Sequence, residues 1–465
     1  EFLKFQLTMQ YIKLSRKKNI GVKKQFDQQI LTQFINQLPF KLTPDQNAAV
    51  DEIINDLKKD TIMYRFIQGD VGSGKTVVGA IGLYANYLAG FQGAMMAPTE
   101  ILASQHFKSL NILFKETGIN LALLTGRLSN KEKQNIYQDL DSGKINIVVG
   151  THALFQDKVS YQKLGLVITD EQHRFGVNQR KALKEKGQQV DFMVMSATPI
   201  PRTLAISLYG DMDVSTIKTM PTGRKKVITD VIKSHSMKPI LNNLKKYLAS
   251  GGQCYVVCPL VAESEVIDSR DTTSIYEGMK AYFKGNYEVG LLHGKMDDEV
   301  KEHIMEDFKN NQIQILVSTT VIEVGVDVSN ANWMVIYNAE RFGLSQLHQL
   351  RGRVGRGNEQ GYCYLLSNSS SKEAIERLEF LKSCHDGFEV SYYDLKVRGP
   401  GDILGNQQSG LPSLIIGDIF KDINILEVSR KDAKELLESK SNDAVYLKLI
   451  SEIEEQLINN NKYID

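Results

Sequence analysis

The chain has 465 residues, too many for one ordinary hydrophobic core, so we expect two or three domains of about 100–200 residues. Hydrophobic residues make up 42% of it, an ordinary share for a globular protein. Lysine and arginine (56) nearly balance aspartate and glutamate (55), which excludes recognition of nucleic acid through net charge alone and leaves it to local patterning. The sequence has no long uncharged apolar run and no signal peptide, which predicts a cytoplasmic protein without a membrane partner.

The first forty residues differ from the rest in their pattern of apolar and basic residues, and we expect a helical linker over residues 1–40. Apolar residues fit helical spacing at Phe2, Phe5, Met9 and Ile12, although an alternating pattern fits Leu3, Phe5, Leu7 and Met9 equally well. Basic residues gather nearby, with a solvated face favoured over phosphate contacts: Lys13, Arg16, Lys17, Lys18, Lys23 and Lys24. Thr43 and Pro44 then predict the N-cap and the first residue of the next helix.

A glycine-rich loop follows, and it carries the strongest chemical signal in the chain. It reads Gly69-Asp70-Val71-Gly72-Ser73-Gly74-Lys75-Thr76, after an apolar run at 63–67 and before a helical run at 77–88. In this context the spacing predicts a strand, a phosphate-binding loop and a helix whose positive end faces the phosphates. Lys75 would reach the β- and γ-phosphates of a nucleoside triphosphate, and the Thr76 hydroxyl would bind Mg²⁺.

Short β-rich runs alternate with helical patterns up to about residue 220, which predicts βαβ units and a parallel sheet. The expected strands are 93–97, 145–149, 164–169 and 191–195. Each ends at a polar cluster, and the carboxyl ends of parallel strands share the edge where such sheets bind ligands. The clusters are Pro98-Thr99-Glu100, Gly150-Thr151-His152, Asp170-Glu171-Gln172-His173 and Ser196-Ala197-Thr198-Pro199.

Asp170 and Glu171 carry the predicted chemistry of this edge. Asp170 follows an apolar strand and can complete the Mg²⁺ shell opposite Thr76, while Glu171 can orient and deprotonate the attacking water. Two adjacent acidic residues are more often a solvated turn. Downstream of a phosphate loop, the catalytic interpretation is favoured.

A second βαβ series covers about residues 225–370, with expected strands at 253–259, 287–292, 313–318 and 331–337. The first of these holds Cys254 and Cys258, which we interpret as core thiols rather than zinc ligands because no second ligand pair accompanies them. The four cysteines show no disulfide framework and indicate a reducing compartment.

Near the end of the second series stands Gln349-Leu350-Arg351-Gly352-Arg353-Val354-Gly355-Arg356-Gly357. Arginines between glycines present guanidinium forks where the backbone can approach closely, which suits the charge on a transferred phosphoryl group. We expect arginine fingers that reach the triphosphate across an interdomain cleft, whose closure would couple hydrolysis to movement. A basic surface loop is the alternative.

Taken together, these motifs resemble the ordered set of superfamily 2 helicases, and more closely the RecG family of bacterial ATP-dependent DNA helicases. The resemblance covers residues 38 to about 412. It implies an α/β fold with two RecA-like parallel-sheet motor domains in tandem, at 41–222 and 223–375. The N-terminal helical linker would precede them, and a C-terminal segment of translocation motif and helices would follow at 376–465.

The resemblance further implies an enzyme that hydrolyses ATP with Mg²⁺ and moves 3′ to 5′ on double-stranded DNA. Its substrates would be branched DNA, such as stalled replication forks and Holliday junctions, in recombination and repair. The implied partners are branched DNA and single-stranded-DNA-binding protein, with the chain itself a monomer. It would work in the bacterial cytoplasm, associated with the nucleoid.

The resemblance also assigns roles to individual residues. For catalysis these are Lys75, Glu171, Arg353 and Arg356; for ATP they are Gln46 at the adenine, the loop from Gly69 to Thr76, and Asp327; for the metal they are Thr76 and Asp170. Coupling falls to His173, Ser196, Thr198, Gln349 and Arg398. Contacts to the DNA backbone fall to Pro98, Thr99, Thr125, Gly126, Gly150, Thr151, His152, Thr319 and Thr320. Small hydroxyl and glycine residues suit that role because they hold phosphates without reading bases.

Residues 388–410 resemble the translocation motif that RecG shares with the transcription-repair coupling factor, although by themselves they indicate only a loop-rich segment interrupted by glycine and proline. RecG proteins also carry an N-terminal wedge domain that binds the junction. Here residues 1–38 resemble only the linker helix that follows it. We therefore expect a fragment of a longer protein, which the absence of an initial methionine favours, or a natural form without the wedge.

Three functions stay open from the sequence. A branched-DNA helicase is favoured by the spelling of the motifs and by the translocation segment. The motor module of a transcription-repair coupling factor shares that segment but would differ in the tetrad from Asp170 to His173. A non-catalytic nucleotide switch or scaffold is opposed by the expected residue at every catalytic position.

Overall fold

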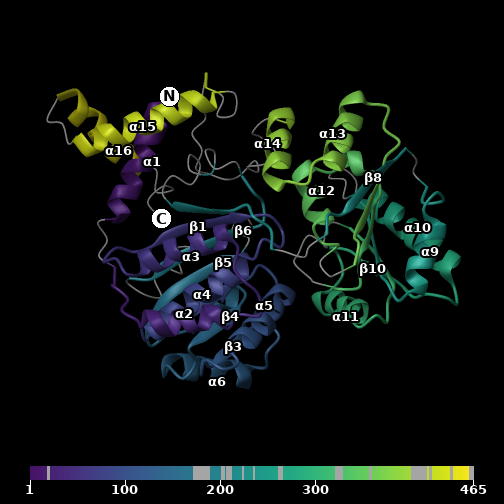
Figure 1. Cartoon of the computed structure of the whole chain (residues 1–465), viewed down its shortest axis with the longest axis horizontal. Helices are drawn as coiled ribbons and strands as arrows, with labels where there is room; N and C mark the ends of the chain where they lie inside the picture. The colour runs from purple at the N-terminus through teal and green to yellow at the C-terminus, as the bar shows by residue number, and fades with distance from the viewer. Residues whose placement is uncertain are drawn as a thin grey trace. The chain divides into compact units, whose positions relative to one another are not determined.

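The computed structural model describes residues 1–17, 21–170, 189–200, 205, 212–221, 225–233, 236–259, 265–319, 328–355, 359–398, 416–417, 422–439 and 444–459. The chain divides into two compact units, described separately below. Unit 1 comprises Glu1–Thr219 and Leu395–Asp465, and unit 2 comprises Met220–Asp394 (Figure 1). Both ends of the chain therefore belong to unit 1. The predicted boundaries at residues 40, 222 and 375 stay predictions.

Unit 1 is built on a parallel sheet whose described strands have the order β3-β4-β2-β5-β6-β1-β7. Most of these strands are short apolar runs buried along nearly their whole length, as is usual for a parallel sheet with helices on its faces. Their bounds are β1 Tyr64–Gly69, β2 Gln92–Met96, β3 Leu121–Leu124, β4 Ile147–Gly150, β5 Leu164–Asp170, β6 Asp191–Ser196 and β7 Asp213–Ile217.

Some helices of unit 1 lie between these strands in the sequence, and others lie near the two ends of the chain. Helix α3 begins as predicted: the Thr43 hydroxyl accepts from the Gln46 N–H at 3.3 Å, the Gln46 Oε1 accepts from the Thr43 N–H at 2.8 Å, and Pro44 is the first helical residue. The bounds are α1 Phe2–Lys17, α2 Gln28–Asn36, α3 Pro44–Leu57, α4 Lys75–Leu88, α5 Glu100–Leu113, α6 Asn130–Asp141, the 3₁₀ turn η1 His152–Phe155, α15 Ile423–Ser439 and α16 Ala444–Asn459.

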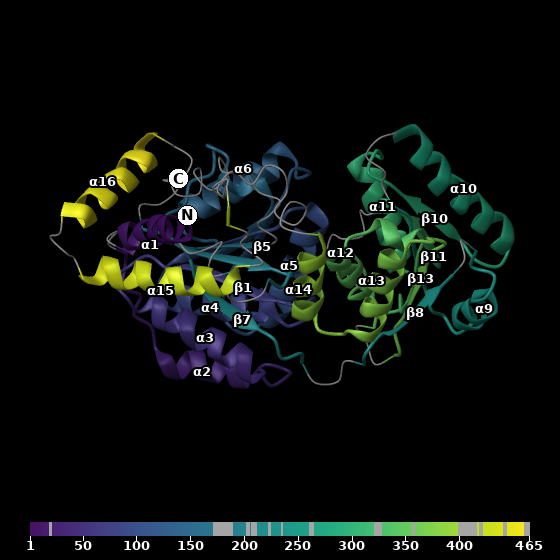
Figure 2. The ribbon, with the colours of Figure 1, turned by 90° about the horizontal axis from the view of Figure 1, so that it is seen from above.

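The N-terminal helix packs with the two C-terminal helices, and all three lie side by side in Figures 1 and 2. Their shared core contains one apolar cluster: Leu7, Ile12, Ala433, Leu437 and Ile453. The helical interpretation of the first residues is therefore confirmed. The alternating pattern, which would have predicted a strand, is wrong, because α1 buries its apolar stripe against other helices.

The segment after α1 is fastened to the body of unit 1. Gly21 N–H donates to the Asp60 carbonyl at 2.7 Å, and Lys24 N–H donates to the Leu57 carbonyl at 2.9 Å. The Lys24 side chain is only 1% exposed, where its ammonium donates to the Gly165 carbonyl at 2.8 Å and pairs with the Asp191 carboxylate.

The basic cluster of the first residues is thus only partly a solvated face. Lys23 is exposed, as predicted. Lys13, by contrast, pairs with Asp213 at 2.6 Å, and Lys24 is a buried structural cation. The prediction of a solvated face is wrong for Lys24, because charge in a sequence does not reveal a buried carboxylate that comes from a distant strand.

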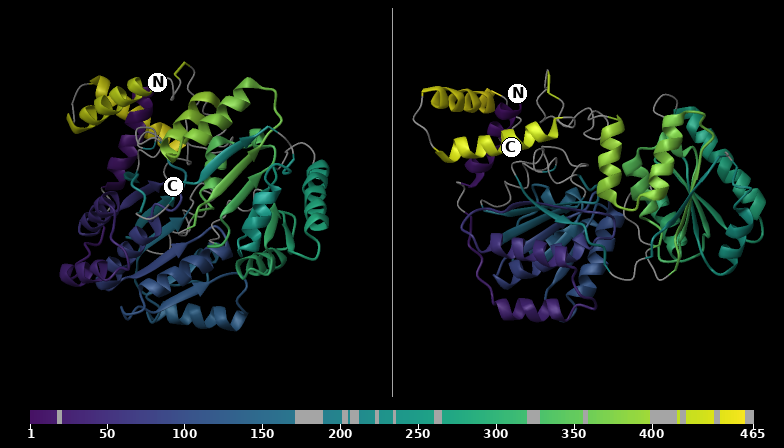
Figure 3. Two further views of the ribbon diagram at one scale, coloured as in Figure 1. Left: turned by 45° about the vertical axis from the view of Figure 1, so that its right-hand side comes forward. Right: turned by 45° about the horizontal axis from the view of Figure 1, so that its top comes forward.

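Unit 2 is also built on a parallel sheet, with described strands in the order β10-β11-β9-β12-β13-β8. Figure 3 shows this sheet nearly edge-on in its right panel, with helices on both sides. The strands are β8 Ile228–Ile232, β9 Cys254–Val257, β10 Val289–Leu292, β11 Ile315–Ser318, β12 Trp333–Ile336 and β13 Tyr362–Leu366. The helices are α9 Leu241–Ala249, α10 Glu265–Phe283, α11 Asp298–Lys309, the turn η4 Ala339–Arg341, α12 Leu344–Arg351 and α13 Lys372–Ser383. Helix α14, Gly387–Arg398, begins in unit 2, and its residues from Leu395 onward belong to unit 1.

The expected strands are all present within a few residues of their predicted bounds. The sequence reasoning missed β3, β7, β8 and β13, which are short or only half buried at several positions. Cys254 begins β9 and Cys258 directly follows its end; both are buried, and burial raises the pKa of the Cys254 thiol. Both belong to the hydrophobic core of unit 2, as predicted.

Residues 388–398 form a helix, so the interpretation of residues 388–410 as loop-rich is wrong for its first part. The glycine and proline interruptions begin only at Gly399. Tertiary contacts decide the helix, since the Tyr393 ring stacks on Phe380 at 4.0 Å and the Asp394 carboxylate accepts from the Ser345 N–H at 3.1 Å. In the described parts of the chain, no helix has the length and apolar character needed to cross a membrane.

Candidate nucleotide and nucleic-acid site

The glycine loop between β1 and α4 has the backbone that phosphate binding requires. Gly72 and Gly74 adopt φ values of 82° and 84°, a region that side chains with a Cβ avoid. A Cβ on Gly74 would lie 2.2 Å from the Nε2 of Gln46, so any larger residue would displace that side chain. The loop is therefore a close-fitting turn that leads into the N-terminus of α4, which begins at Lys75.

Two polar side chains of this loop are buried. Lys75 is 8% exposed, and its ammonium donates to the carbonyls of Gly69 at 2.8 Å and Asp70 at 2.9 Å. The Ser73 hydroxyl is fully buried and makes no hydrogen bond to the protein. A buried hydroxyl without a bond is costly unless another group supplies one, which a phosphate oxygen would do.

Gln46 joins the start of α3 to this loop. Its Nε2 donates to the Ser73 carbonyl at 2.7 Å, and its Oε1 accepts from Thr43. The neighbouring Asp45 carboxylate accepts from the N–H of Lys218 at 2.9 Å and from the N–H and hydroxyl of Thr219 at 2.7 and 2.8 Å. The first turn of α3 thus contacts both the phosphate loop and the last residues of unit 1 before the chain enters unit 2.

Asp170 ends strand β5, two strands away from the phosphate loop. Its register partner on β6 is Met195, which in turn pairs with Ile67 on β1, so the three residues stand level across the sheet. Two strand spacings amount to about 10 Å. The Asp170 carboxylate is 2.8 Å from the Nε2 of His106 on α5, and both residues are buried.

Sequence reasoning missed His106. A usable signal was present, because Leu102, His106 and Leu110 recur at four-residue intervals and place one polar side chain in the buried stripe of α5.

Ser196 and Thr198 lie at the carboxyl end of β6, between β5 and β1. Their hydroxyls are 2.7 Å apart, and the Thr198 N–H donates to the Ser196 hydroxyl at 3.2 Å. Two residues on, the Ile200 N–H donates to the side chain of Gln68, the residue just before the phosphate loop. The segment proposed for coupling is therefore bonded to the strand that carries the loop.

The residues expected to contact DNA in unit 1 follow β2, β4 and β3, which are neighbours in the sheet. Thr99 caps α5 by accepting from the Leu102 N–H at 3.3 Å. Glu100 accepts from the Gly126 N–H at 2.7 Å and pairs with Arg127 at 2.9 Å, which joins the loop after β2 to the loop after β3. A Cβ on Gly150 would lie 2.2 Å from the Leu124 carbonyl.

Side-chain exposure differs among these residues. Thr125 and Thr151 are buried, whereas Gly126 and His152 are exposed. Main-chain groups and exposed side chains such as His152 would thus contact a nucleic-acid backbone more readily than the buried hydroxyls of Thr125 and Thr151 would.

Unit 2 holds three more of the predicted residues that the structure describes: Thr319, Gln349 and Arg353. Thr319 follows β11, is buried, and donates its N–H to the Leu292 carbonyl at 3.2 Å. Gln349 lies on α12 and Arg353 two residues beyond its end, both half-buried. Several predicted residues lie outside the described residues: Glu171, His173, Thr320, Asp327 and Arg356, together with the side chain of Arg398.

The topology of unit 1 sorts the candidate residues along one edge of the sheet. The strands β5, β6 and β1 end at Asp170, Ser196 and the phosphate loop, and the strands β3, β4 and β2 end at the three loops expected to contact DNA. Because the strands are parallel, both groups lie at the carboxyl edge, where open α/β sheets bind ligands.

The residues at this edge fit a magnesium nucleotide. No group of three His, Cys, Asp or Glu side chains among the described residues forms a metal site by itself. Mg²⁺ usually takes one or two protein ligands and completes its shell with phosphates and water. Thr76 and Asp170 are the residues that would hold it, with the phosphates held by the loop that surrounds the Ser73 hydroxyl.

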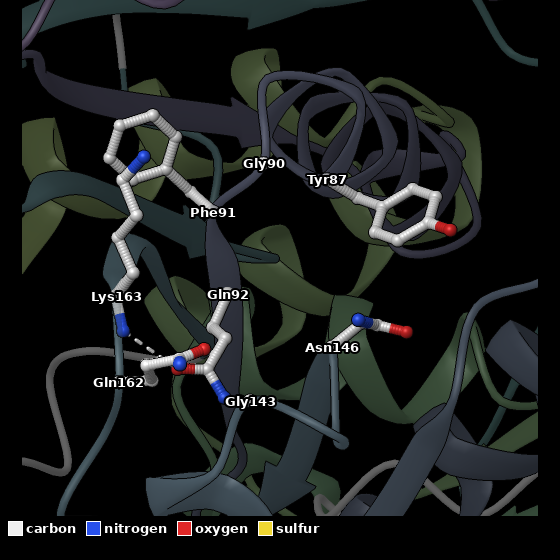
Figure 4. A pocket seen from close by; sticks show the side chains of 8 residues that line it. All are labelled: Tyr87, Gly90, Phe91, Gln92, Gly143, Asn146, Gln162 and Lys163. Atoms are coloured by element: carbon white, nitrogen blue, oxygen red, sulfur yellow. Dashed lines mark hydrogen bonds between the residues drawn. The ribbon is translucent and has the colours of Figure 1, made fainter.

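A separate cavity of about 460 Å³ lies at the opposite, amino edge of the same sheet (Figure 4). Its lining comes from the starts of β2, β4 and β5 and the end of α4: Tyr87, Gly90, Phe91, Gln92, Gly143, Asn146, Gln162 and Lys163. The Lys163 ammonium lies over the Phe91 ring, 4.1 Å from its centroid. The side chain of Gln92 bonds to main-chain groups of Leu140, Ile145 and Lys163. The cavity is separate from the nucleotide edge, because its lining residues lie at or before the starts of the strands and not at their carboxyl ends.

Comparison with protein families agrees with this arrangement. Residues 43–206 match the DEAD/DEAH box helicase model, residues 239–358 match the helicase conserved C-terminal domain, and residues 384–459 match the C-terminal part of domain 3 of ATP-dependent DNA helicase RecG. The ATP-dependent DNA helicase RecG of Bacillus subtilis is 49% identical over 94% of this chain, and that of Staphylococcus aureus is 48% identical. The chain spans 64% of the length of these relatives.

Among solved structures, RecG bound to a three-way DNA junction is similar to this chain. It is 44% identical with a TM-score of 0.77, over 92% of this chain and 56% of that one. Saccharomyces cerevisiae Dbp5 bound to RNA and ADP BeF3 matches with a TM-score of 0.57 at 18% identity, over 80% of this chain and 97% of that one. At that identity the second match concerns the fold alone.

Proposed function

The chain belongs to the RecG family, with two RecA-like domains in tandem, and from that premise we propose that it is the motor of an ATP-dependent DNA helicase. It hydrolyses ATP with Mg²⁺ and moves 3′ to 5′ along double-stranded DNA at branched structures such as stalled forks and Holliday junctions. Its role lies in recombination and repair, in the bacterial cytoplasm at the nucleoid. It acts as a monomer, with single-stranded-DNA-binding protein as a further partner.

One observation carries the proposal: the phosphate loop, Asp170 and the loops expected to contact DNA lie along a single edge of the sheet in unit 1. A site for a nucleotide and a surface for a track would therefore share one edge of the same sheet, on neighbouring groups of strands. Support for branched DNA comes from the similar RecG that was solved on a three-way junction.

Each residue of the edge has a defined task in this proposal. The phosphate loop and Lys75 bind and orient the triphosphate, and Thr76 and Asp170 hold Mg²⁺, which neutralises charge on the phosphates when bound. Glu171 acts as the base that orients the attacking water, and Arg353 and Arg356 stabilise charge on the transferred group. Gln46 and Asp327 contact the nucleotide, and His173, Ser196, Thr198, Gln349 and Arg398 pass its state to the DNA side.

The remaining assignments concern the DNA backbone: Pro98, Thr99, Thr125, Gly126, Gly150, Thr151 and His152 in unit 1, with Thr319 and Thr320 in unit 2. They contact phosphates and sugars without reading sequence, which suits a motor that must travel over any duplex.

The test is the steady-state ATPase rate without DNA, with linear duplex, with single-stranded DNA and with a model fork. It compares this chain with Glu171→Gln and with Glu116→Gln, an exposed control that removes the same charge. Stimulation by the fork that only Glu171→Gln abolishes is the expected result. Equal stimulation by duplex and fork would leave the motor intact and assign junction specificity to residues outside this chain.

Two other functions make different predictions. The motor of a transcription-repair coupling factor would retain RNA polymerase in a pull-down, whereas the match of residues 384–459 to the RecG model favours RecG. A nucleotide-dependent scaffold would bind ATP yet show negligible turnover on every DNA.

A further inference from the structure

His106 and Asp170 form a contact that none of the assignments above uses. The Nε2 of His106 lies 2.8 Å from the Oδ2 of Asp170, and the two residues are 7% and 9% exposed. A carboxylate at that depth requires hydrogen-bond donors, and the imidazole supplies one of them. The orientation of the Asp170 side chain is therefore tied to a residue of another element.

That element is α5, and its first turn belongs to the loops proposed to contact DNA. Thr99 caps the helix, and Glu100 binds the Gly126 N–H and Arg127. His106 lies seven residues after Thr99, two turns or about 10 Å along the helix axis. The helix thus carries a proposed DNA contact at one end and a hydrogen bond to the metal carboxylate two turns further on.

We propose that His106 is a positioning residue that holds the Asp170 carboxylate for Mg²⁺ and links it to the DNA-contact end of α5. The proposal rests on the proposed function, since it names a route by which DNA regulates the same nucleotide site. Movement of α5 upon DNA binding changes the direction from which the imidazole holds the carboxylate, and with it the geometry of the metal ligand.

The physical basis is the general effect of groups behind a metal ligand. A carboxylate without an orienting partner samples several rotamers, and loss of such a partner commonly lowers metal affinity or activity by about 10–100-fold. A purely space-filling histidine would show no such effect, because any side chain of similar volume would replace it.

Two substitutions separate these cases. His106→Gln keeps an N–H donor at a similar reach, whereas His106→Leu keeps apolar volume but removes the donor. Leu110→Val is the matched control, since Leu110 is buried on the same helix one turn later and the change disturbs packing alone.

The first readout is binding rather than turnover. A fluorescent, non-hydrolysable ATP analogue is titrated with and without Mg²⁺, and the gain in affinity due to Mg²⁺ is compared among variants. We expect His106→Leu to lose about 10–100-fold of that gain, with His106→Gln and Leu110→Val close to the parent chain. Binding without Mg²⁺ should be the same in all four proteins.

The second readout is the ratio of ATPase rates with and without duplex DNA at saturating Mg²⁺. His106→Leu should bring this ratio close to one, while Leu110→Val should keep it. A normal Mg²⁺ gain or a normal DNA ratio in His106→Leu would overturn the proposal, as would equal losses in His106→Leu and Leu110→Val. If the parent chain shows no DNA stimulation, the proposed function fails, and the nucleotide titration still decides whether His106 positions Asp170.

Discussion

The side chain of Gln46 donates a hydrogen bond to the main-chain carbonyl of Ser73 at 2.7 Å, which fastens the first turn of α3 to the phosphate loop. The same side chain closes the capping box with Thr43. One residue therefore stabilises a helix start and fixes the loop proposed to bind the phosphates. Its removal should affect nucleotide binding more than it affects the fold.

We predict that Gln46→Ala raises the KM for ATP about tenfold, because one hydrogen bond to the loop is worth about 1–1.5 kcal/mol. The control Thr43→Ala removes the cap hydroxyl but leaves the bond to Ser73. It should lower stability by about 1 kcal/mol and leave the KM near that of the parent chain. ATPase kinetics and urea unfolding measure the two effects, and equal rises in KM would mean that Gln46 acts only through the cap.

The buried pair of Lys24 and Asp191 gives a prediction about stability. Desolvation lowers the pKa of Lys24 and raises that of Asp191, and each charge opposes the shift of the other. Lys24→Met leaves the carboxylate buried without its partner and should cost about 3–5 kcal/mol. The double variant with Asp191→Asn should be more stable than the sum of the single losses by about 1–3 kcal/mol.

Urea denaturation of the four proteins measures this coupling. Lys23→Met is the control, because Lys23 is exposed and its loss should change stability by no more than about 0.5 kcal/mol. If the stability losses of Lys24→Met and Asp191→Asn simply add up in the double variant, the two side chains do not interact directly.

The Asp45 carboxylate accepts hydrogen bonds from Lys218 and Thr219, and the stability that these bonds contribute should depend on pH. The pKa of Asp45 lies below its ordinary value of 3.8, mainly because the main-chain N–H of Thr219 donates to the carboxylate. A carboxyl with a lower pKa in the folded state stabilises fully above its unfolded pKa and loses that stabilisation as pH falls through the folded pKa. Because the carboxylate is partly exposed, solvent screening reduces this stabilisation, and we expect Asp45→Asn to cost about 0.5–1 kcal/mol at pH 7 and less near pH 3.

Chemical denaturation at both pH values checks this prediction. Asp51→Asn, an exposed change on the same helix, serves as the control, and we expect it to change stability by no more than about 0.5 kcal/mol. A cost for Asp45→Asn that stays constant down to pH 3 would contradict the role assigned to the charge.

Glu100 joins the loops after β2 and β3, so its charge should influence DNA binding and spare ATP binding. Glu100→Gln keeps an acceptor for the Gly126 N–H but loses the ion pair with Arg127. Because that pair is partly exposed, we expect a modest effect, a three- to fivefold rise in the DNA concentration for half-maximal ATPase, or about 0.7–1 kcal/mol. The KM for ATP without DNA should not change, and a rise in that KM alone would refute the assignment of this loop.

Much of the fold follows from local pattern. Runs such as 164–169 and 331–337 are apolar, bounded by polar clusters and separated by helical stretches, and in the structure they are the buried parallel strands β5 and β12. The phosphate loop could be read directly because its chemistry depends on residues adjacent in sequence. The four missed strands lack such continuous burial. Two of them are held in the sheet by pairing with strands distant in sequence, β3 with β4 and β8 with β13.

The sequence by itself determined the similarity to RecG helicases, the parallel architecture and the loop from Gly69 to Thr76, since each is encoded in a contiguous motif or in a fixed order of motifs. Only the tertiary structure decided that Lys24 is a buried cation, that residues 388–398 are helical and that His106 binds Asp170. Each contact joins residues that are distant in sequence. Lys24 and Asp191 are 167 positions apart, Phe380 and Tyr393 are 13 apart, and His106 and Asp170 are 64 apart. Local propensity contains no information about such partners, because burial and hydrogen bonding arise from which elements the fold packs together.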